Sequence, residues 1–411
     1  MALVHWLDVL IAPLTWLARA RGRRRLALLA AYAVVLGVVG VLLAREVRFR
    51  RLPGVADPVD RRAAGHVDLA DADNAMIQYR RALARLAGPG TVADRERAAL
   101  DLWLAGTSCP DALPVRPTDL TEPTSVAVDP DLSDLLELAN REATRRLNSG
   151  NLDGSWAIIR GMIRTGLHAG RHGGDAATTA SRELLWRVSP QVSPWATAPG
   201  NTSARLRGAL ADVAGLEALV PPFSETLQIE SFVRRAALAR EGADPSPAPL
   251  DRIAPGTKWL NQLPGVARFH RFWADEPRTS LRLDLVLLAG QLAHCDLPAP
   301  LDRPLLPRYG IYAVTSRTPP GLAAVSPATL ESLVEDSNLR ARRGEFAWML
   351  SRHRAAFWVL RRQIAVELAV AADRLDHPDR PAQSVKDLVG PYLATPPPGP
   401  NQFDWDAVSS F

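Results

Sequence analysis

Cysteine and lysine are scarce in this 411-residue chain, which contains two of each. So few cysteines exclude a disulfide-rich scaffold, and neither belongs to a Cys-x-x-Cys redox or zinc motif. The chain also lacks a Gly-x-Ser-x-Gly elbow, a P-loop and a Gly-x-Gly-x-x-Gly turn. Each of these motifs performs a specific chemistry, so the sequence indicates no cofactor and no recognised catalytic class. A non-enzymatic role is the better expectation.

Lysine occurs only at positions 258 and 386, and arginine supplies nearly all the positive charge. This usage fits a coding bias toward GC-rich codons better than selection for phosphate binding. The formal net charge is +5, but arginines crowd the first 51 residues and the remainder is close to neutral. We therefore expect no nucleic-acid partner.

Long uncharged apolar runs are absent except at Leu26–Ala44, which is flanked by arginines on both sides. As a helix, this run extends about 28 Å, close to the roughly 30 Å hydrocarbon layer of a bilayer. A cleaved signal peptide is the alternative. The apolar run is longer than the usual signal core, and Leu42-Leu43-Ala44-Arg45 offers no Ala-x-Ala cleavage site. The sequence therefore predicts an uncleaved single-pass anchor in the cell membrane, with lipid as its partner.

Arginine counts on the two sides of the span favour a cytoplasmic N-terminus and an extracytoplasmic main domain. The tail of residues 1–25 places Trp6 and several leucines on one side of a helix that ends in a basic cluster. This pattern fits a helix lying in the membrane interface, although Pro13 interrupts it. A flexible leader is the alternative.

Proline and glycine clusters divide the rest of the chain into blocks whose apolar residues recur with a helical period. We expect an all-α fold, with an N-terminal transmembrane helix followed by an irregular array or bundle of helical hairpins. The expected boundaries are a juxtamembrane linker at 45–65, an α-helical soluble domain at 66–395 and a C-terminal tail at 396–411. One long helix begins near Phe346 and continues to Leu375.

The clearest hairpin joins a helix ending near Gly150 to a second helix with Trp156 and other apolar residues on its inner face. Ser133 or Asp131 is expected to cap the first helix, and Asp153 the second. The turn GNLDGSWA from Gly150 resembles the turn of a tetratricopeptide repeat. No second copy follows at a 34-residue step, so the sequence does not establish a regular solenoid.

Further segments resemble a family of uncharacterised bacterial single-pass membrane proteins. They are Asn74-Ala75 with Tyr79 and Ala82-Leu83, AALDLWLAGTSCPDAL from Ala98, GNLDGSWAIIRGMIRTGLHAGRHGG from Gly150, SETLQIESF from Ser224, and RLDHPDRPAQSVKDLVGPYL from Arg374. The resemblance implies a shared helical domain and supplies no known activity. The last segment also resembles the stretch that follows the long helix of secretion pseudopilins, with Arg380-Pro381 in place of their tyrosine-proline pair.

His168, His172 and Asp175 are the candidate metal ligands. Four-residue spacing puts both imidazoles on one helical face, as a divalent cation requires. Glycines at 170, 173 and 174 interrupt the helix around them, however, and a histidine in a last helical turn also interacts favourably with the helix dipole.

Cys109 and Cys295 each end a predicted helix before a proline-containing turn. An oxidising compartment would permit a disulfide between them, and two independent buried thiols are the alternative.

These observations favour a membrane-anchored helical module that binds or scaffolds an unidentified protein partner. The alternatives are a component of a secretion or pilus-like apparatus and an enzyme with an unrecognised His/Asp site.

Overall fold

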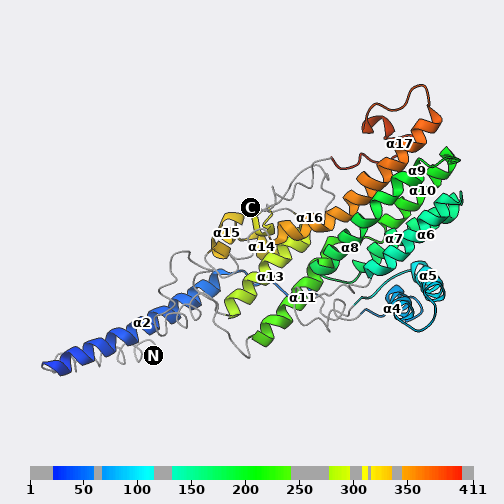
Figure 1. Ribbon diagram of the computed structural model, residues 1–411. Helices are drawn as coiled ribbons and strands as arrows, with labels where there is room; N and C mark the ends of the chain where they lie inside the picture. Colours follow the sequence, from blue (N-terminus) through cyan, green and yellow to red (C-terminus); the bar gives the residue numbers. More distant parts are fainter. Residues whose placement is uncertain are drawn as a thin grey trace. The chain divides into compact units, whose positions relative to one another are not determined.

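The computed structural model describes residues 22–59, 67–114, 132–241, 277–296, 308–312, 316–335 and 345–399. Within these ranges the chain is helical and contains no strand, only two isolated β-bridges, which confirms the all-α prediction (Figure 1). The α-helices are α2 (Arg23–Arg51), α4 (Ala75–Leu86), α5 (Val92–Ser108), α6 (Leu132–Asn148), α7 (Leu152–Ala169), α8 (Asp175–Val188), α9 (Val192–Ala196), α10 (Ser203–Glu217), α11 (Phe223–Glu241), α13 (Pro277–His294), α14 (Pro320–Ala323), α15 (Pro327–Glu335), α16 (Glu345–Trp358) and α17 (Ala365–Asp376). The interfacial helix expected near the N-terminus lies outside the described residues, apart from its last four positions.

The chain divides into two compact units. Unit 1 comprises Met1–Val55, Pro247–Val286 and Ser332–Ala341, and unit 2 comprises Ala56–Ser246, Leu287–Glu331 and Arg342–Phe411. The expected single soluble domain at 66–395 therefore contributes to both units.

Helix α2 dominates the described part of unit 1 and continues beyond the predicted end of the apolar run at Ala44 to Arg51. Glu46 and Arg50, four residues apart on the helix, form an ion pair (2.8 Å) that supports the added turns. Pro53 follows shortly after the helix ends. Arg282 of α13 lies over the ring of Phe49 and donates a hydrogen bond to the carbonyl of Pro53 (2.9 Å). The first part of the predicted linker is thus helical and held in place.

Among the described residues, α2 is the one helix long and apolar enough to cross a membrane, over Leu29–Arg51. Its apolar side chains are exposed on all sides, including Val34 (66% exposed) and Leu43 (62%). An exposed apolar surface of this kind is unfavourable in water.

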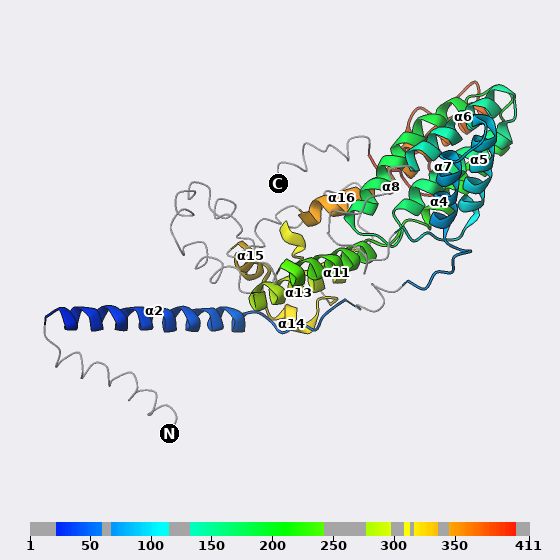
Figure 2. The same cartoon turned by 60° about the horizontal axis from the view of Figure 1, so that its bottom comes forward.

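The first helices of unit 2 pack against their neighbours in the chain. Helices α4 and α5 form one pair, and α6, α7 and α8 follow as a second group joined by short turns (Figure 2). Gly106 of α5 permits the close approach of α4, because a Cβ atom there would lie 2.6 Å from the ring of the fully buried Tyr79.

The predicted α6–α7 hairpin is present, and Gly150 at its turn has the left-handed φ of 77° expected for a helix stop. The predicted cap of α7 is wrong by two residues. The side chain of Asn151 accepts the capping hydrogen bond from the backbone of Gly154 (2.9 Å), and Asp153 lies inside the first turn. Both residue types favour this position, so the sequence alone does not separate them.

The predicted C-terminal helix is interrupted rather than regular. Helix α16 passes into a π-helical segment, η7 (Val359–Ile364), which continues as α17. The apolar stripe survives the interruption, since Leu360, Ile364 and Leu368 are all buried in the core of unit 2. Helix α16 packs on α8, and α17 packs on α10.

Candidate functional site

The turn between α7 and α8 brings together charged residues from four distant parts of unit 2. The sequence GRHGG at positions 170–174 ends α7 and starts α8, and His172 adopts a left-handed φ of 49° within it. The structure places His168, His172 and Asp175 in three different sets of contacts.

His168 is fully buried at the end of α7. Its Nδ1 atom lies 2.9 Å from the hydroxyl of Tyr79, which receives a hydrogen bond from Thr165 (3.3 Å). Trp103 in turn donates its ring N–H to Thr165 (3.0 Å). Burial lowers the pKa of His168 to about 3 and the positive charge of Arg164 adds to this effect, so the ring is neutral at physiological pH. His168 therefore belongs to a polar network that joins α4, α5 and α7.

His172 lies between two carboxylates. Its Nε2 atom is 2.8 Å from Asp111, and its Nδ1 atom is 3.1 Å from Glu225 at the start of α11. Burial disfavours the charged ring, but the hydrogen bonds to both carboxylates outweigh burial and raise the pKa of His172 to about 9. The ring is therefore a cation at neutral pH, with both nitrogens protonated and no lone pair available for a metal.

Asp111 accepts from Arg171 as well as from His172. The guanidinium of Arg171 reaches both carboxylate oxygens, at 2.9 and 3.2 Å. Burial opposes ionisation of Asp111, but the hydrogen bonds from His172 and Arg171 are together stronger and hold its pKa well below the usual range. We call this four-residue set, Asp111, Arg171, His172 and Glu225, the turn cluster. It ties the segment after α5 to the α7–α8 turn and to α11.

Asp175 faces a different direction and accepts a hydrogen bond from Arg352 of α16 (2.8 Å). Its backbone N–H points at Glu230 of α11 (3.3 Å), whose carboxylate also lies 3.9 Å from Arg234. A Cβ atom at Gly174 would lie 2.5 Å from the Glu230 carboxylate, so glycine makes this approach possible. Burial raises the pKa of Glu230 to about 7, despite the nearby charge of Arg234.

Replacing Glu230 by glutamine is expected to stabilise the protein at pH 8. The raised pKa means that folding disfavours the charged carboxylate, a penalty that develops as the pH rises from the ordinary value of 4.5 through 7. An amide keeps an acceptor for the Asp175 N–H without the charge. Urea unfolding at pH 8 should show a gain of about 1 to 3 kcal/mol for Glu230→Gln. The exposed Glu137→Gln should change little, and a loss of stability in Glu230→Gln would contradict the assignment.

The three predicted metal ligands thus have separate protein partners. Among the residues that the structure describes, no group of three or more His, Cys, Asp or Glu side chains is placed to hold a metal ion. His168, His172 and Asp175 each make contacts within unit 2, and their role as metal ligands stays a prediction.

Cys109 and Cys295 are buried free thiols in the structure, and a disulfide between them in an oxidising compartment stays a prediction. Each sulfur packs into a different hydrophobic cluster of unit 2. Burial raises the pKa of Cys295 to about 12, which makes its thiol unreactive.

Helices α8 and α16 also line an open cavity of about 530 Å³. We call it the arginine–tryptophan groove, and its lining residues are Arg182, Glu183, Trp186, Arg187, Trp348 and Arg352. The sequence does not predict this groove. Trp186 and Trp348 lie beside apolar residues in the sequence, which favours core packing, and the arginines of α8 do not stand out in an arginine-rich chain. The four-residue spacing of Arg182 with Trp186, and of Trp348 with Arg352, is the signal that the sequence offers.

Comparison with known proteins gave no match, since no protein-family model, curated protein or solved structure resembles the chain significantly.

Proposed function

We propose that the chain is a single-pass membrane protein whose α2 helix anchors a helical module that binds or scaffolds another protein. The packing of α4 with α5, and of α7 with both α6 and α8, is the observation that carries this proposal. Arrays of helical pairs expose extended surfaces that bind other proteins without any catalytic group.

The anchor assignment rests on α2. A helix that exposes apolar side chains on every face is stable in lipid and unfavourable in water, and its internal hydrogen bonds satisfy the backbone polar groups. Arginines flank the apolar run, as they do at the polar boundaries of membrane spans.

With the N-terminus in the cytoplasm, unit 2 is extracytoplasmic. Protease added outside intact spheroplasts should then digest unit 2. Digestion only after lysis would indicate the opposite orientation, with unit 2 in the cytoplasm.

The charged groups of unit 2 support a binding role over an enzymatic one. His172 is protonated and paired on both sides, and His168 is neutral and fully buried. A general base needs a proton acceptor within reach of a substrate, which neither ring provides. A secretion role based on a pilin-like sheet also lacks support, because the described residues contain no strand beside Pro381 or elsewhere.

Site-specific photo-crosslinking tests the proposal. A photoreactive amino acid replaces one exposed arginine on each of α4, α6, α7 and α8, in the full chain and in its native membrane: Arg85, Arg141, Arg160 and Arg187. A binding module should give a discrete crosslinked product from positions on one face and none from the opposite face. Absence of a discrete product at every position would contradict the proposal, as would the same products at all positions.

A further inference from the structure

The arginine–tryptophan groove lies entirely within unit 2, and two helical stripes form it. On α8, Trp186 follows Arg182 by four residues and Arg187 follows Glu183 by four residues. The four side chains therefore lie on one side of the last two turns of the helix. On α16, Trp348 and Arg352 have the same spacing. Because α8 and α16 pack against each other, the two stripes face one space.

The groove carries an excess of positive charge. Arg352 forms part of its wall, where it donates hydrogen bonds to Asp175 (2.8 Å) and Thr179 (2.6 Å) and its guanidinium lies over the ring of Trp348. Arg182 and Arg187 provide two further positive charges, Glu183 lies 3.5 Å from Arg182, and Asp175 offsets the charge of Arg352. These three arginines and two carboxylates leave one positive charge in excess. Charge complementarity therefore favours a negatively charged occupant.

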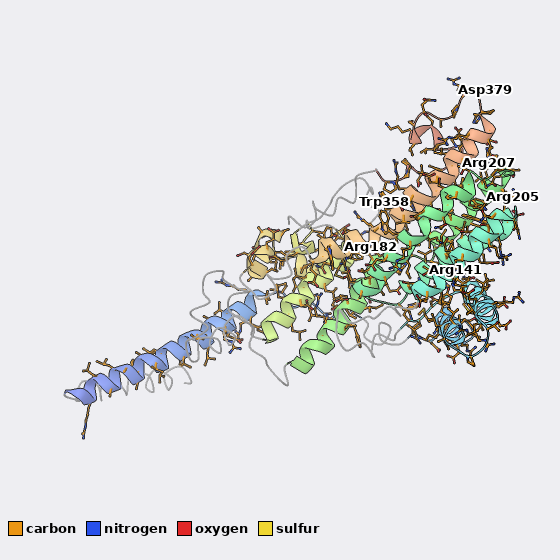
Figure 3. All side chains as sticks on the ribbon, viewed as in Figure 1. Arg141, Arg182, Arg205, Arg207, Trp358 and Asp379 are labelled. Atoms are coloured by element: carbon orange, nitrogen blue, oxygen red, sulfur yellow. The ribbon has the colours of Figure 1, made fainter. Side chains whose placement is uncertain are left out.

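Rigid aromatic rings provide the apolar part of the groove. Trp186 stacks on Trp358 with 5.2 Å between ring centroids, so its ring is held in place. Figure 3 marks Trp358 on α16 and Arg182 on α8. Trp348 is 37% exposed, which is unusual for a large aromatic residue in a packed helix pair. Tryptophan and arginine are the residue types that contribute most often to binding energy at protein interfaces.

We infer that this groove binds an acidic peptide segment of the protein partner, an inference that rests on the proposed function. Arg182 and Arg187 pair with carboxylates of the segment. Trp348 covers an apolar side chain that lies between those carboxylates in the segment. The groove is open to solvent, whereas sites for small molecules enclose most of the ligand surface. An open groove with fork-shaped donors suits a chain that carries Asp or Glu side chains.

Fluorescence anisotropy on the full chain in detergent micelles tests the inference. The probe is a fluorescein-labelled decapeptide with four glutamates around a central phenylalanine, and its matched counterparts carry four glutamines or four lysines. The acidic peptide should bind, and its affinity should fall as salt rises from 50 to 500 mM. The double variant Arg182→Gln/Arg187→Gln should lose about tenfold in affinity. Arg141→Gln/Arg207→Gln removes the same charge from exposed positions outside the groove and should bind within about twofold of the unmodified chain.

Equal binding of the glutamine peptide, an affinity independent of salt, or equal losses in the two double variants would each overturn the inference. Binding of phosphatidylglycerol vesicles or of a second copy through Arg182 and Arg187, without binding of the acidic peptide, would assign the groove to lipid or to self-association instead. If the acidic peptide fails while position-specific crosslinks arise from α4, α6 or α7, the groove assignment is wrong and the binding module stands. If no position in unit 2 crosslinks, the proposed function itself fails.

Discussion

Replacing Trp103 by alanine is expected to lower the free energy of unfolding by about 3 to 5 kcal/mol, because it removes a large ring from the core of unit 2. Trp103 on α5 is completely buried, and a Cβ atom at Gly161 of α7 would lie 2.9 Å from its ring. The substitution leaves a cavity between α5 and α7. It also removes the hydrogen bond that Trp103 donates to Thr165 within the network of His168. Urea unfolding followed by far-UV circular dichroism, on the full chain in mild detergent, measures the change.

The same substitution at Trp348 is the matched control. This tryptophan is 37% exposed, so its removal creates no enclosed cavity and should cost less than about 1 kcal/mol. Similar losses at the two positions would show that Trp103 does not occupy the core position described.

Replacing Asp111 by alanine is expected to cost about 2 to 3 kcal/mol at pH 6.5, because it leaves the charges of Arg171 and His172 in a partly buried site without their shared partner. The three side chains are 22%, 19% and 15% exposed, so solvent screens the loss only in part. Asp153→Ala is the control, since the Asp153 side chain is 79% exposed and its ion pair with Arg205 should contribute less than about 1 kcal/mol.

The pH dependence of this loss distinguishes the turn cluster from an ordinary packing contact. The pKa of His172 is about 9 in the folded chain and 6.5 when unfolded. The stabilisation by protonated His172 is therefore complete below pH 6.5 and disappears as the pH rises through 9. The difference between the unmodified chain and Asp111→Ala should shrink from pH 6.5 to pH 10. A difference that stays constant over this range would contradict the assigned ion pairs.

Local sequence patterns predict the helices well. Apolar periodicity predicts the two helices of the α6–α7 hairpin, and the glycine at position 150 predicts the turn between them. Both signals depend only on residues that are close together in the sequence. The π-helical turn at Val359–Ile364 is not predicted, since an apolar stripe looks similar in the sequence whether or not one turn is wider. The extension of α2 to Arg51 is not predicted either, because hydropathy marks where the apolar run ends and not where the helix ends.

The candidate site is predicted only in part, for a physical reason. The sequence identifies His168, His172 and Asp175 from their spacing, but their partners lie far along the chain. Tyr79 is 89 residues from His168, and Arg352 is 177 residues from Asp175. The packing of whole helices creates these pairs, and no local pattern encodes it. The same limit applies to the arginine–tryptophan groove, whose two walls come from helices far apart in the sequence.

Alkaline carbonate extraction of membranes tests the central claim, that α2 anchors the chain, most directly. The full-length chain should remain in the membrane pellet, because removing exposed Leu, Val and Ala side chains from water holds α2 in lipid. The double variant Val35→Arg/Val39→Arg places two charges in the span, at a cost of roughly 3 kcal/mol each, and should shift much of the chain to the supernatant. Val35→Ala/Val39→Ala should stay in the pellet. Recovery of the unmodified chain in the supernatant, or of a product shortened past α2, would contradict the account.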